Sequence, residues 1–576
     1  MENKLIAFIL NEIADMLSID ETETSKFEVR AYKNAALVVE SLQEPIEEIY
    51  QKGGKEALME LPGIGKGLAE KIEEYLTKGR IEKYEKLKKK YPINFFELTS
   101  LEGIGAKTAV LLYQKLKIKN IADLKKAIEE HKIREVPNFG IKSEEEFKRS
   151  IKLFESGKGR ILLGEALPIA ESIINKLLEN GKVKKAVIAG SVRRMKETVG
   201  DIDILAITGE IEKTMGYFTE MEEVQNVISK GQAKTTVWLK TGISCDLRVI
   251  KSESFGAAQQ YFIGSKEHNI EVRKIALKNK LKLNEYGLFD SNGKMISGED
   301  EHDIYEKLGL QYIPPEMREN KGEIELAAKH KIPKLVELSD IKGDLHTHTK
   351  DSDGINSIEE MAEAALQNKF EYFATTNHTK SLKIAHGMNE SRFREFFKNV
   401  DKLNDSVGKK IKILKGAEVD ILRDGSLDLE KGMLKELDCV LGSIHSFFKM
   451  GQEEMTKRVI NAIDSGLIHI FAHPTGRIIN ERMAYNINLD KVAEAAERNK
   501  VALEINSFPN RLDLNDANIF NVSKYKILFS IDSDAHNTSH FQFLRYGVGT
   551  AKRGWLTKER ILNAKPYNEL IKALKK

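Results

Sequence analysis

Two aspartates, Asp201 and Asp203, stand two residues apart in the segment DIDIL. Alternate residues of a β-strand point to the same face, so both carboxylates would project together while Ile202 and Ile204 enter the core. A third aspartate, Asp246, lies in a second alternating segment, CDLRV. Paired carboxylates of this kind are the hard oxygen ligands that two divalent ions about 4 Å apart require in phosphoryl transfer, with Mg²⁺ or Mn²⁺ as the usual metal.

The segment upstream of the aspartate pair narrows this chemistry. Gly190 and Ser191 end the run IAGS, and nine residues separate Ser191 from Asp201. An aspartate pair alone is more often a solvent-facing pair on a strand. Combined with the Gly-Ser turn and the third aspartate, the pattern predicts a nucleotidyltransferase in which Asp201, Asp203 and Asp246 hold the metal ions and are catalytic.

The C-terminal part of the chain carries a second set of residues that could bind metal. Nine of the 13 histidines lie in the last 240 residues. Six histidines and three carboxylates in this part follow short apolar runs: His346, His348, His378, His445, His473, His536, Asp353, Glu418 and Asp534. A lone buried histidine is usually a hydrogen-bonded core residue, but so many at one edge cannot all be satisfied without cations. Imidazole and carboxylate ligands without thiolate favour Mn²⁺, Zn²⁺ or Fe.

Two Gly-rich turns near the N-terminus predict contact with a phosphate backbone. They are LPGIGK, with Gly63, Gly65 and Lys66, and LEGIGAK, with Gly103, Gly105 and Lys107. Glycine permits a tight turn, and the helix that follows directs its N–H groups at an anion. One such turn is more often an ordinary connection between helices. Two copies about 40 residues apart, with lysines nearby, predict DNA binding without sequence preference and resemble helix-hairpin-helix motifs.

The elements that must position these residues divide the chain into stretches. Residues 1–90 and 91–150 read as helices broken by Gly and Pro, and strands alternate with helices over 151–315. A polar connection, 316–336, is the main expected domain boundary. From 337 to 576, seven apolar runs alternate with helical stretches, which predicts a distorted (β/α)7 barrel with its chemistry at the C-terminal ends of the strands.

Composition limits the class of protein. Hydrophobic residues make up 41% and charged residues 31%, with a net charge of +3, which describes a globular protein and neither requires nor excludes nucleic acid. No apolar run approaches a bilayer span, and the first residues show no cleavage-site pattern. Cys245 and Cys439 are too few for a disulfide framework or a thiolate metal site. We expect a cytoplasmic monomer with no membrane partner.

The order of these motifs along all 576 residues resembles the bacterial-type family X DNA polymerases that carry a C-terminal PHP phosphoesterase domain. The resemblance implies a multidomain protein: a lyase-like helical domain at 1–90, a fingers-like helical domain at 91–150, an α/β palm and thumb at 151–315 similar to polymerase beta, a linker, and the PHP barrel at 337–576. It implies filling of short gaps in DNA repair, with gapped or primer-template DNA and dNTPs as partners.

The resemblance also assigns roles to single residues. Gly190, Ser191, Arg194 and Arg160 would hold the incoming triphosphate, and Tyr261, Phe262 and Gly264 in YFIGS would pack against its sugar. Asn269 and Arg273 would face the nascent base and the template strand. Lys71, supported by Tyr32, would be a Schiff-base lyase residue, although Glu28 and Gly67 stand where relatives carry basic residues.

For the barrel, the resemblance implies about three metal ions and 3′→5′ exonuclease action. Arg477 would neutralise the phosphate. Asn377 stands where the family usually has Asp, and would orient His378 by a hydrogen bond without carrying charge.

Two alternatives remain open. The barrel could be a phosphatase or a structural module, and the first half could be a template-independent nucleotidyltransferase. The paired Gly-rich turns and YFIGS argue against the second alternative, because neither serves a small acceptor.

Overall fold

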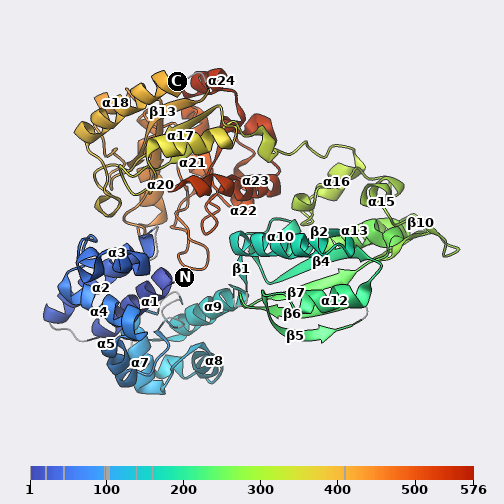
Figure 1. Ribbon diagram of the computed structural model, residues 1–576, viewed down its shortest axis with the longest axis horizontal. Coiled ribbons are helices and arrows are strands. Elements are labelled where there is room, and N and C mark those ends of the chain that lie inside the picture. Colours follow the sequence, from blue (N-terminus) through green and yellow to red (C-terminus); the bar gives the residue numbers. More distant parts are fainter. Residues whose placement is uncertain are drawn as a thin grey trace. The chain divides into compact units, whose positions relative to one another are not determined.

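The computed structural model describes residues 2–19, 23–42, 46–95, 98, 101, 104–137, 139–157, 160–231, 233–407 and 410–575. The chain forms two compact units, Met1–Lys158 and Gly159–Lys576 (Figure 1).

The first unit is helical. Its helices are α1 (Glu2–Leu17), α2 (Glu23–Ser41), α3 (Ile46–Met59), α4 (Lys66–Lys78), α5 (Glu82–Lys90), α7 (Ala106–Leu116), α8 (Ile121–Glu129), η1 (Ile133–Glu135) and α9 (Ile141–Gly157). One hydrophobic core joins them, and it includes Ile6, Leu10 and Ile13 of α1 at the spacing of an amphipathic helix. Ile64 and Ile104, the central residues of the two Gly-rich turns, are buried in this core. Each turn is therefore anchored by its isoleucine.

The second unit begins with a five-stranded mixed sheet, which we call the mixed-sheet region (160–250). Its strand order is β2-β4-β7-β6-β5. Its elements are β1 (Ile161–Leu162), α10 (Leu163–Glu179), β2 (Val183–Ile188), α11 (Gly190–Arg193), β3 (Thr198–Val199), β4 (Asp201–Thr208), α12 (Ile211–Thr219), β5 (Val224–Lys230), β6 (Lys234–Leu239) and β7 (Ser244–Val249). Among the described residues of this sheet only β4 and β7 pair in parallel, and both are interior strands.

The next segment (251–336) is the small-sheet region. It contains α13 (Phe255–Ile263), α14 (Lys266–Lys278), β8 (Lys282–Asn284), β9 (Gly287–Phe289), β10 (Met295–Ser297), α15 (Glu301–Lys307), η3 (Pro315–Met317) and α16 (Glu323–Ala328). The stretch 316–336, which the sequence marked as a polar connection, contributes Ile324 and Ala327 to the core of this region.

The C-terminal part is a barrel of seven parallel strands in sequential order (Figure 1). The strands are β11 (Gly343–Thr347), β12 (Tyr372–Thr375), β13 (Lys412–Asp420), β14 (Cys439–Ser443), β15 (Ile470–Phe471), β16 (Ala502–Asn506) and β17 (Phe529–Asp532). The helices are α17 (Ile358–Gln367), α18 (Glu390–Val407), α19 (Lys431–Leu434), α20 (Gln452–Asp464), α21 (Leu489–Asn499), α22 (Asp516–Val522), α23 (Leu544–Arg553) and α24 (Tyr567–Leu574). Thr347 forms a bridge with Ala535, so the first and last strands meet. The predicted (β/α)7 barrel is confirmed.

The mixed-sheet region and the barrel share a packed contact. Leu512 and Tyr546 of the barrel join the hydrophobic core of the mixed-sheet region. A Cβ on Gly164 would lie 2.3 Å from Pro509 Cβ, so α10 approaches the barrel closely enough to require glycine. This contact, and not a flexible linker alone, connects the two parts of the second unit.

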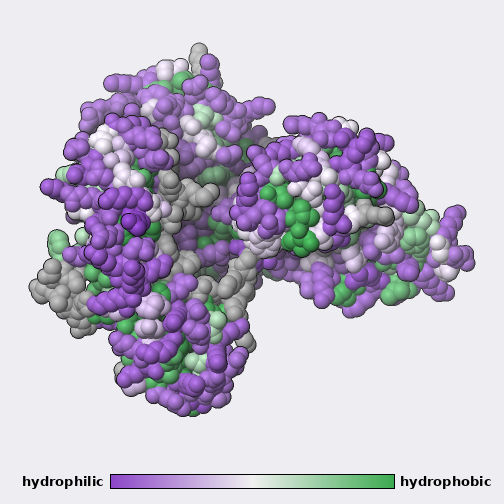
Figure 2. All heavy atoms as spheres, turned by 60° about the horizontal axis from the view of Figure 1, so that its bottom comes forward, coloured by the Kyte–Doolittle hydropathy of each residue, from purple (hydrophilic) through white to green (hydrophobic). Residues whose placement is uncertain are grey.

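The face of the molecule drawn in Figure 2 is mostly hydrophilic, with scattered hydrophobic patches. No helix in the described part of the chain is both long and apolar enough to cross a bilayer.

Candidate active sites

The three predicted catalytic aspartates lie on two adjacent interior strands of the mixed sheet. Asp203 of β4 stands opposite Asp246 of β7 in the parallel register. Ile202 and Ile204 are fully buried, as the alternation predicted, so the carboxylates share the other face. The Asp246 carboxylate contacts Lys234 Nζ at 2.6 Å.

The surroundings of Asp203 destabilise the ionised form of its carboxyl group. Burial, followed by the carboxylates of Asp201 and Asp246, raises the pKa of Asp203 to about 6. A cation beside Asp203 would stabilise its ionised form, and therefore the donor set fits a divalent metal. Across the described residues, groups of three or more ligand atoms within 4.8 Å of one another occur only in the barrel. The oxygens of Asp201, Asp203 and Asp246 are therefore farther apart than the ligand atoms of the barrel groups.

Gly190 is required by the close approach of α11 to β4. Its φ is +61°, and a Cβ at this position would lie 2.5 Å from Asp203 Oδ2. The Gly-Ser turn can therefore pass directly over the aspartate pair only with glycine there.

A pocket of about 480 Å³ opens beside Asp201 and Asp203. Its lining includes all nine residues that the sequence assigned to the nucleotide: Arg160, Gly190, Ser191, Arg194, Tyr261, Phe262, Gly264, Asn269 and Arg273. These residues come from the start of the second unit, from α11 and from the α13–α14 corner, so only the fold brings them together. Asp246 lies outside this lining.

The polar groups of this pocket suit a phosphate. The Ser191 hydroxyl is buried and has no hydrogen-bond partner among the described residues. Arg194 Nε donates to Glu319 Oε1 at 3.1 Å, and Arg160 Nε donates to Thr198 Oγ1 at 3.1 Å. A free hydroxyl beside two guanidinium groups can receive the oxygens of a polyphosphate.

The corner between α13 and α14 forms the opposite wall. The Tyr261 and Phe262 rings meet edge to face at 5.0 Å, and the Arg273 guanidinium lies 5.9 Å from the Tyr261 ring. Asn269 Nδ2 donates to the Tyr261 carbonyl at 2.7 Å, and Asn269 Oδ1 accepts from Gln260 at 2.9 Å. Asn269 therefore fixes the end of α13 as well as lining the pocket.

The barrel gathers its histidines and carboxylates into three overlapping groups at the C-terminal ends of the strands. These groups are His348, Asp353, His378 and His536; then His346, His348 and Asp534; then His378, Glu418 and His445. His473 lies beside them, with Nε2 at 2.9 Å from Glu418 Oε1. Because His348 and His378 each belong to two groups, the ions that such groups hold would share ligands.

Several ring nitrogens in this cluster are buried without a hydrogen-bond partner among the described residues. They are His346 Nε2, both ring nitrogens of His348, His378 Nδ1 and His473 Nδ1. Four of these five atoms lie 2.9–3.5 Å from a carboxylate oxygen of Asp353, Glu418 or Asp534 without hydrogen-bond geometry. Nitrogen and oxygen atoms that converge in this way, and are not satisfied by one another, indicate that cations complete the site. Burial, followed by the charges of His536 and His378, lowers the pKa of His348 to about 4, which keeps this imidazole in the neutral form that binds metal.

Sequence reasoning missed residues that hold the ligands in place. Glu504 on β16 accepts from His346 Nδ1 at 2.6 Å and from the His473 N–H at 2.5 Å. Asp420 contacts His445 Nδ1 at 3.2 Å. Carboxylates in this position orient metal-binding histidines. The signal for Glu504 was a single carboxylate inside the otherwise apolar run VALEI.

Two expectations for the barrel need correction. Asn377 does not bond His378: its Oδ1 accepts from the Thr349 N–H at 2.9 Å and from the Ser352 hydroxyl at 2.7 Å, so it stabilises the loop before Asp353. Arg477 does not face the cluster, because its Nη2 pairs with Glu197 of the mixed-sheet region at 2.6 Å. Arg511 does lie beside the cluster, with Nε at 3.7 Å from Asp534 Oδ2.

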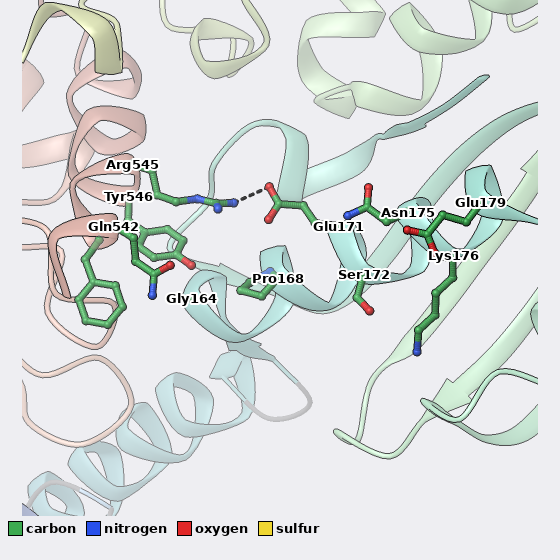
Figure 3. A pocket seen from close by; sticks show the side chains of 11 residues that line it. Gly164, Pro168, Glu171, Ser172, Asn175, Lys176, Glu179, Gln542, Arg545 and Tyr546 are labelled. Atoms are coloured by element: carbon green, nitrogen blue, oxygen red, sulfur yellow. Dashed lines mark hydrogen bonds and ion pairs between the residues drawn. The ribbon is translucent and has the colours of Figure 1, made fainter. Parts of the chain in front are cut away.

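A groove of about 640 Å³ between α10 and the start of α23 is separate from both sites (Figure 3). The Arg545 and Glu171 side chains point toward each other across it and pair at 2.5 Å. The groove is thus part of the contact between the mixed-sheet region and the barrel.

In the first unit, the described residues of the two Gly-rich turns lead directly into helices. Gly63 has a φ of +75°. Gly65 and Gly105 are the N-cap residues of α4 and α7, whose first turns carry no acidic residue. Lys66 and Lys107 are exposed, whereas Gly103 lies outside the described residues.

Lys71 has an acidic neighbour. Its Nζ lies 3.3 Å from Glu74 Oε2, and Lys83 pairs with Glu28 at 2.6 Å. The lyase role stays a prediction.

Comparison with known proteins covers the whole chain. Family models match residues 1–81 (helix-hairpin-helix domain), 95–152 (SAM-like helix-hairpin-helix tandem), 258–319 (DNA polymerase beta thumb) and 344–508 (PHP domain). The DNA polymerase/3′-5′ exonuclease PolX of Bacillus subtilis (strain 168) is 35% identical over 581 aligned residues, which span 100% of both chains. A probable phosphatase of Thermoanaerobacter sp. (strain X514) is 30% identical over 231 residues, 38% of this chain and 89% of the relative. A probable phosphatase of Tolumonas auensis is 32% identical over 169 residues, 28% of this chain and 63% of the relative.

Proposed function

Because the chain belongs to the PolX family of DNA polymerases with a PHP domain, we propose that it fills short gaps in DNA at the Asp201–Asp203–Asp246 site and shortens DNA 3′ ends at the barrel site. The observation that carries the polymerase assignment is the single pocket that joins the aspartate pair to the Ser191 hydroxyl and the Arg194 guanidinium.

In nucleotide addition, the described residues have separate tasks. Ser191, Arg194 and Arg160 bind the triphosphate, and Tyr261 and Phe262 pack against the sugar. Divalent ions held by Asp201, Asp203 and Asp246 would lower the pKa of the primer 3′-hydroxyl and neutralise charge on the phosphates.

DNA is held by the first unit. The turns at Gly65 and Gly105 present helix N-termini and exposed lysines, which suit phosphodiester oxygens and read no sequence.

In 3′-end removal, the barrel binds the terminal phosphodiester. His346, His348 and the other residues of the three groups would hold the ions that activate water for attack on the phosphate. Glu504 and Asp420 keep His346 and His445 oriented, and Arg511 offers positive charge to the phosphate.

One incubation tests both activities. The protein is mixed with a 5′-labelled primer on a one-nucleotide gap in Mn²⁺, with and without the complementary dNTP. We expect shortening without dNTP and extension by one nucleotide with it. Asp203→Asn should lose extension and keep shortening, while His346→Ala should do the reverse. Each variant is the folding control for the other, and extension by Asp203→Asn would refute the polymerase site.

A second candidate function for the barrel is removal of a 3′-phosphate. The similarity to a probable phosphatase, over 231 residues or 38% of this chain, favours it. A primer with a 3′-phosphate distinguishes the two: release of inorganic phosphate without loss of nucleotides would identify a phosphatase, and loss of nucleotides from a 3′-hydroxyl primer would identify the exonuclease.

A further inference from the structure

The middle of α23 in the barrel packs against Met195, the residue that follows Arg194 of the nucleotide pocket. A Cβ on Gly549 would lie 2.6 Å from Met195 Cε and 3.0 Å from Met195 Cβ. Met195 is the neighbour of Arg194, the predicted triphosphate ligand. The barrel therefore touches the backbone that carries Arg194, and a larger residue at 549 would displace it.

A chain of ionic hydrogen bonds runs through this contact. Arg553 at the end of α23 donates from Nη1 to the Arg194 carbonyl at 2.8 Å and to Glu319 Oε1 at 3.1 Å. The same Glu319 oxygen accepts from Arg194 Nε at 3.1 Å. Arg553 Nη2 is held by Asp516 at 2.7 Å. The barrel thus contacts both the backbone and, through Glu319, the guanidinium of Arg194.

These groups are sheltered from solvent, so their interactions are weakly screened. The side chains of Arg553, Glu319 and Arg194 are only 5%, 15% and 12% exposed. Charge-assisted bonds at such sites are stronger than surface ion pairs.

A second set of ion pairs involves Arg193 and Lys552, the residues that precede Arg194 and Arg553 in the chain. Lys552 lies 3.3 Å from Glu316, and Glu316 lies 3.2 Å from Arg193. Two acidic residues of the small-sheet region, Glu316 and Glu319, are therefore held between consecutive basic residues at the ends of α11 and α23. Because both Arg193 and Arg194 are held by such ion pairs, the direction of this segment is fixed as well as its position.

We propose that Arg553 and Glu319 are positioning residues for nucleotide addition, through which the barrel holds the Arg194 guanidinium in the orientation that receives the incoming triphosphate. This inference rests on the proposed polymerase function. A long arginine side chain loses rotamer freedom when it binds a ligand, and a partner that fixes it beforehand removes part of that cost. Arg553, together with Lys196 Nζ at 3.6 Å from Glu319 Oε2, also offsets the charge of Glu319 and so reduces its competition with phosphate for Arg194.

The test is single-nucleotide insertion by the full-length protein, with kcat and KM for the dNTP measured separately. Arg553→Met, which keeps the side-chain stem, and the isosteric Glu319→Gln should each raise KM about tenfold with a smaller change in kcat. Tenfold corresponds to about 1.4 kcal/mol, the scale of one hydrogen bond to a charged group. Arg545→Met is the matched control, because it breaks another ion pair between the barrel and the mixed-sheet region, with Glu171, on the far end of the same helix. Its KM should not change.

A double-mutant comparison tests whether Glu319 affects the KM for the dNTP through Arg194. In an Arg194→Ala background, Glu319→Gln should no longer change KM, because the group that it positions is absent. An equal effect with and without Arg194, or an unchanged KM in both single variants, would overturn the proposal. Failure of the unmodified protein to extend primers would instead refute the polymerase function itself. Shortening of 3′ ends by Arg553→Met and Glu319→Gln at the unmodified rate would show that the barrel in these variants is folded.

Discussion

Replacing Glu504 by Gln tests whether the barrel cluster depends on a carboxylate that holds no metal in our assignment. Glu504 is fully buried and accepts three hydrogen bonds: from His346 Nδ1 at 2.6 Å, from the His473 N–H at 2.5 Å and from Asn506 Nδ2 at 3.3 Å. Glutamine has nearly the same shape, but one of its two ends is an NH₂ group. Whichever way the amide is turned, one of these donors then faces another donor.

The size of the effect follows from those bonds. Loss of one hydrogen bond to a charged group costs about 1.5–3 kcal/mol, which is about 10- to 100-fold in an equilibrium or a rate. Removal of a carboxylate that orients a metal-binding histidine has effects of the same order. We therefore expect 3′-end shortening to fall about 10- to 100-fold, because His346 and the His473 backbone lose their orientation together.

The assay is the time course of shortening of a 5′-labelled primer over a series of Mn²⁺ concentrations, beside single-nucleotide extension by the same preparation. Extension should match the unmodified protein, which shows that the second unit is folded. Glu497→Gln, on the exposed face of α21, makes the same chemical change away from the cluster and should leave shortening intact. Full shortening by Glu504→Gln at low Mn²⁺ would refute the orienting role.

Three other predictions concern the remaining sites. Gly190→Ala should abolish extension and spare shortening, because its Cβ would collide with Asp203, and a gap-filling assay that still shows extension would contradict the packing. Since the pKa of Asp203 is raised to about 6, its neutral acid predominates below that pH and cannot bind the ion. The Mg²⁺ concentration needed for half-maximal extension should therefore rise as the pH falls through about 6, and it should be constant above about pH 7. The same Mg²⁺ requirement at every pH would contradict this explanation. If Lys71 forms a Schiff base, borohydride should trap it on an abasic 5′-phosphate substrate, seen as a gel shift of the labelled strand that Lys71→Arg lacks; the absence of a trapped band from the unmodified protein would contradict the lyase role.

The sequence by itself determined the classes of element and most of the chemistry. Alternation in DIDIL and CDLRV identified strands with their aspartates on one face, and seven apolar runs, five of them carrying histidines at their ends, identified the barrel and its mouth. Such patterns are readable because strand and helix periods are local, and because the ends of parallel strands in a barrel must meet.

Tertiary structure alone decided which groups act on one another. Asn377 and Arg477 sit in the expected motifs, yet one bonds the loop before Asp353 and the other bonds Glu197, which lies 280 residues away in the chain. Glu504 and the Arg194–Glu319–Arg553 chain likewise join segments far apart in sequence. The direction of a side chain toward a distant partner depends on how whole elements pack, and no local period encodes that packing.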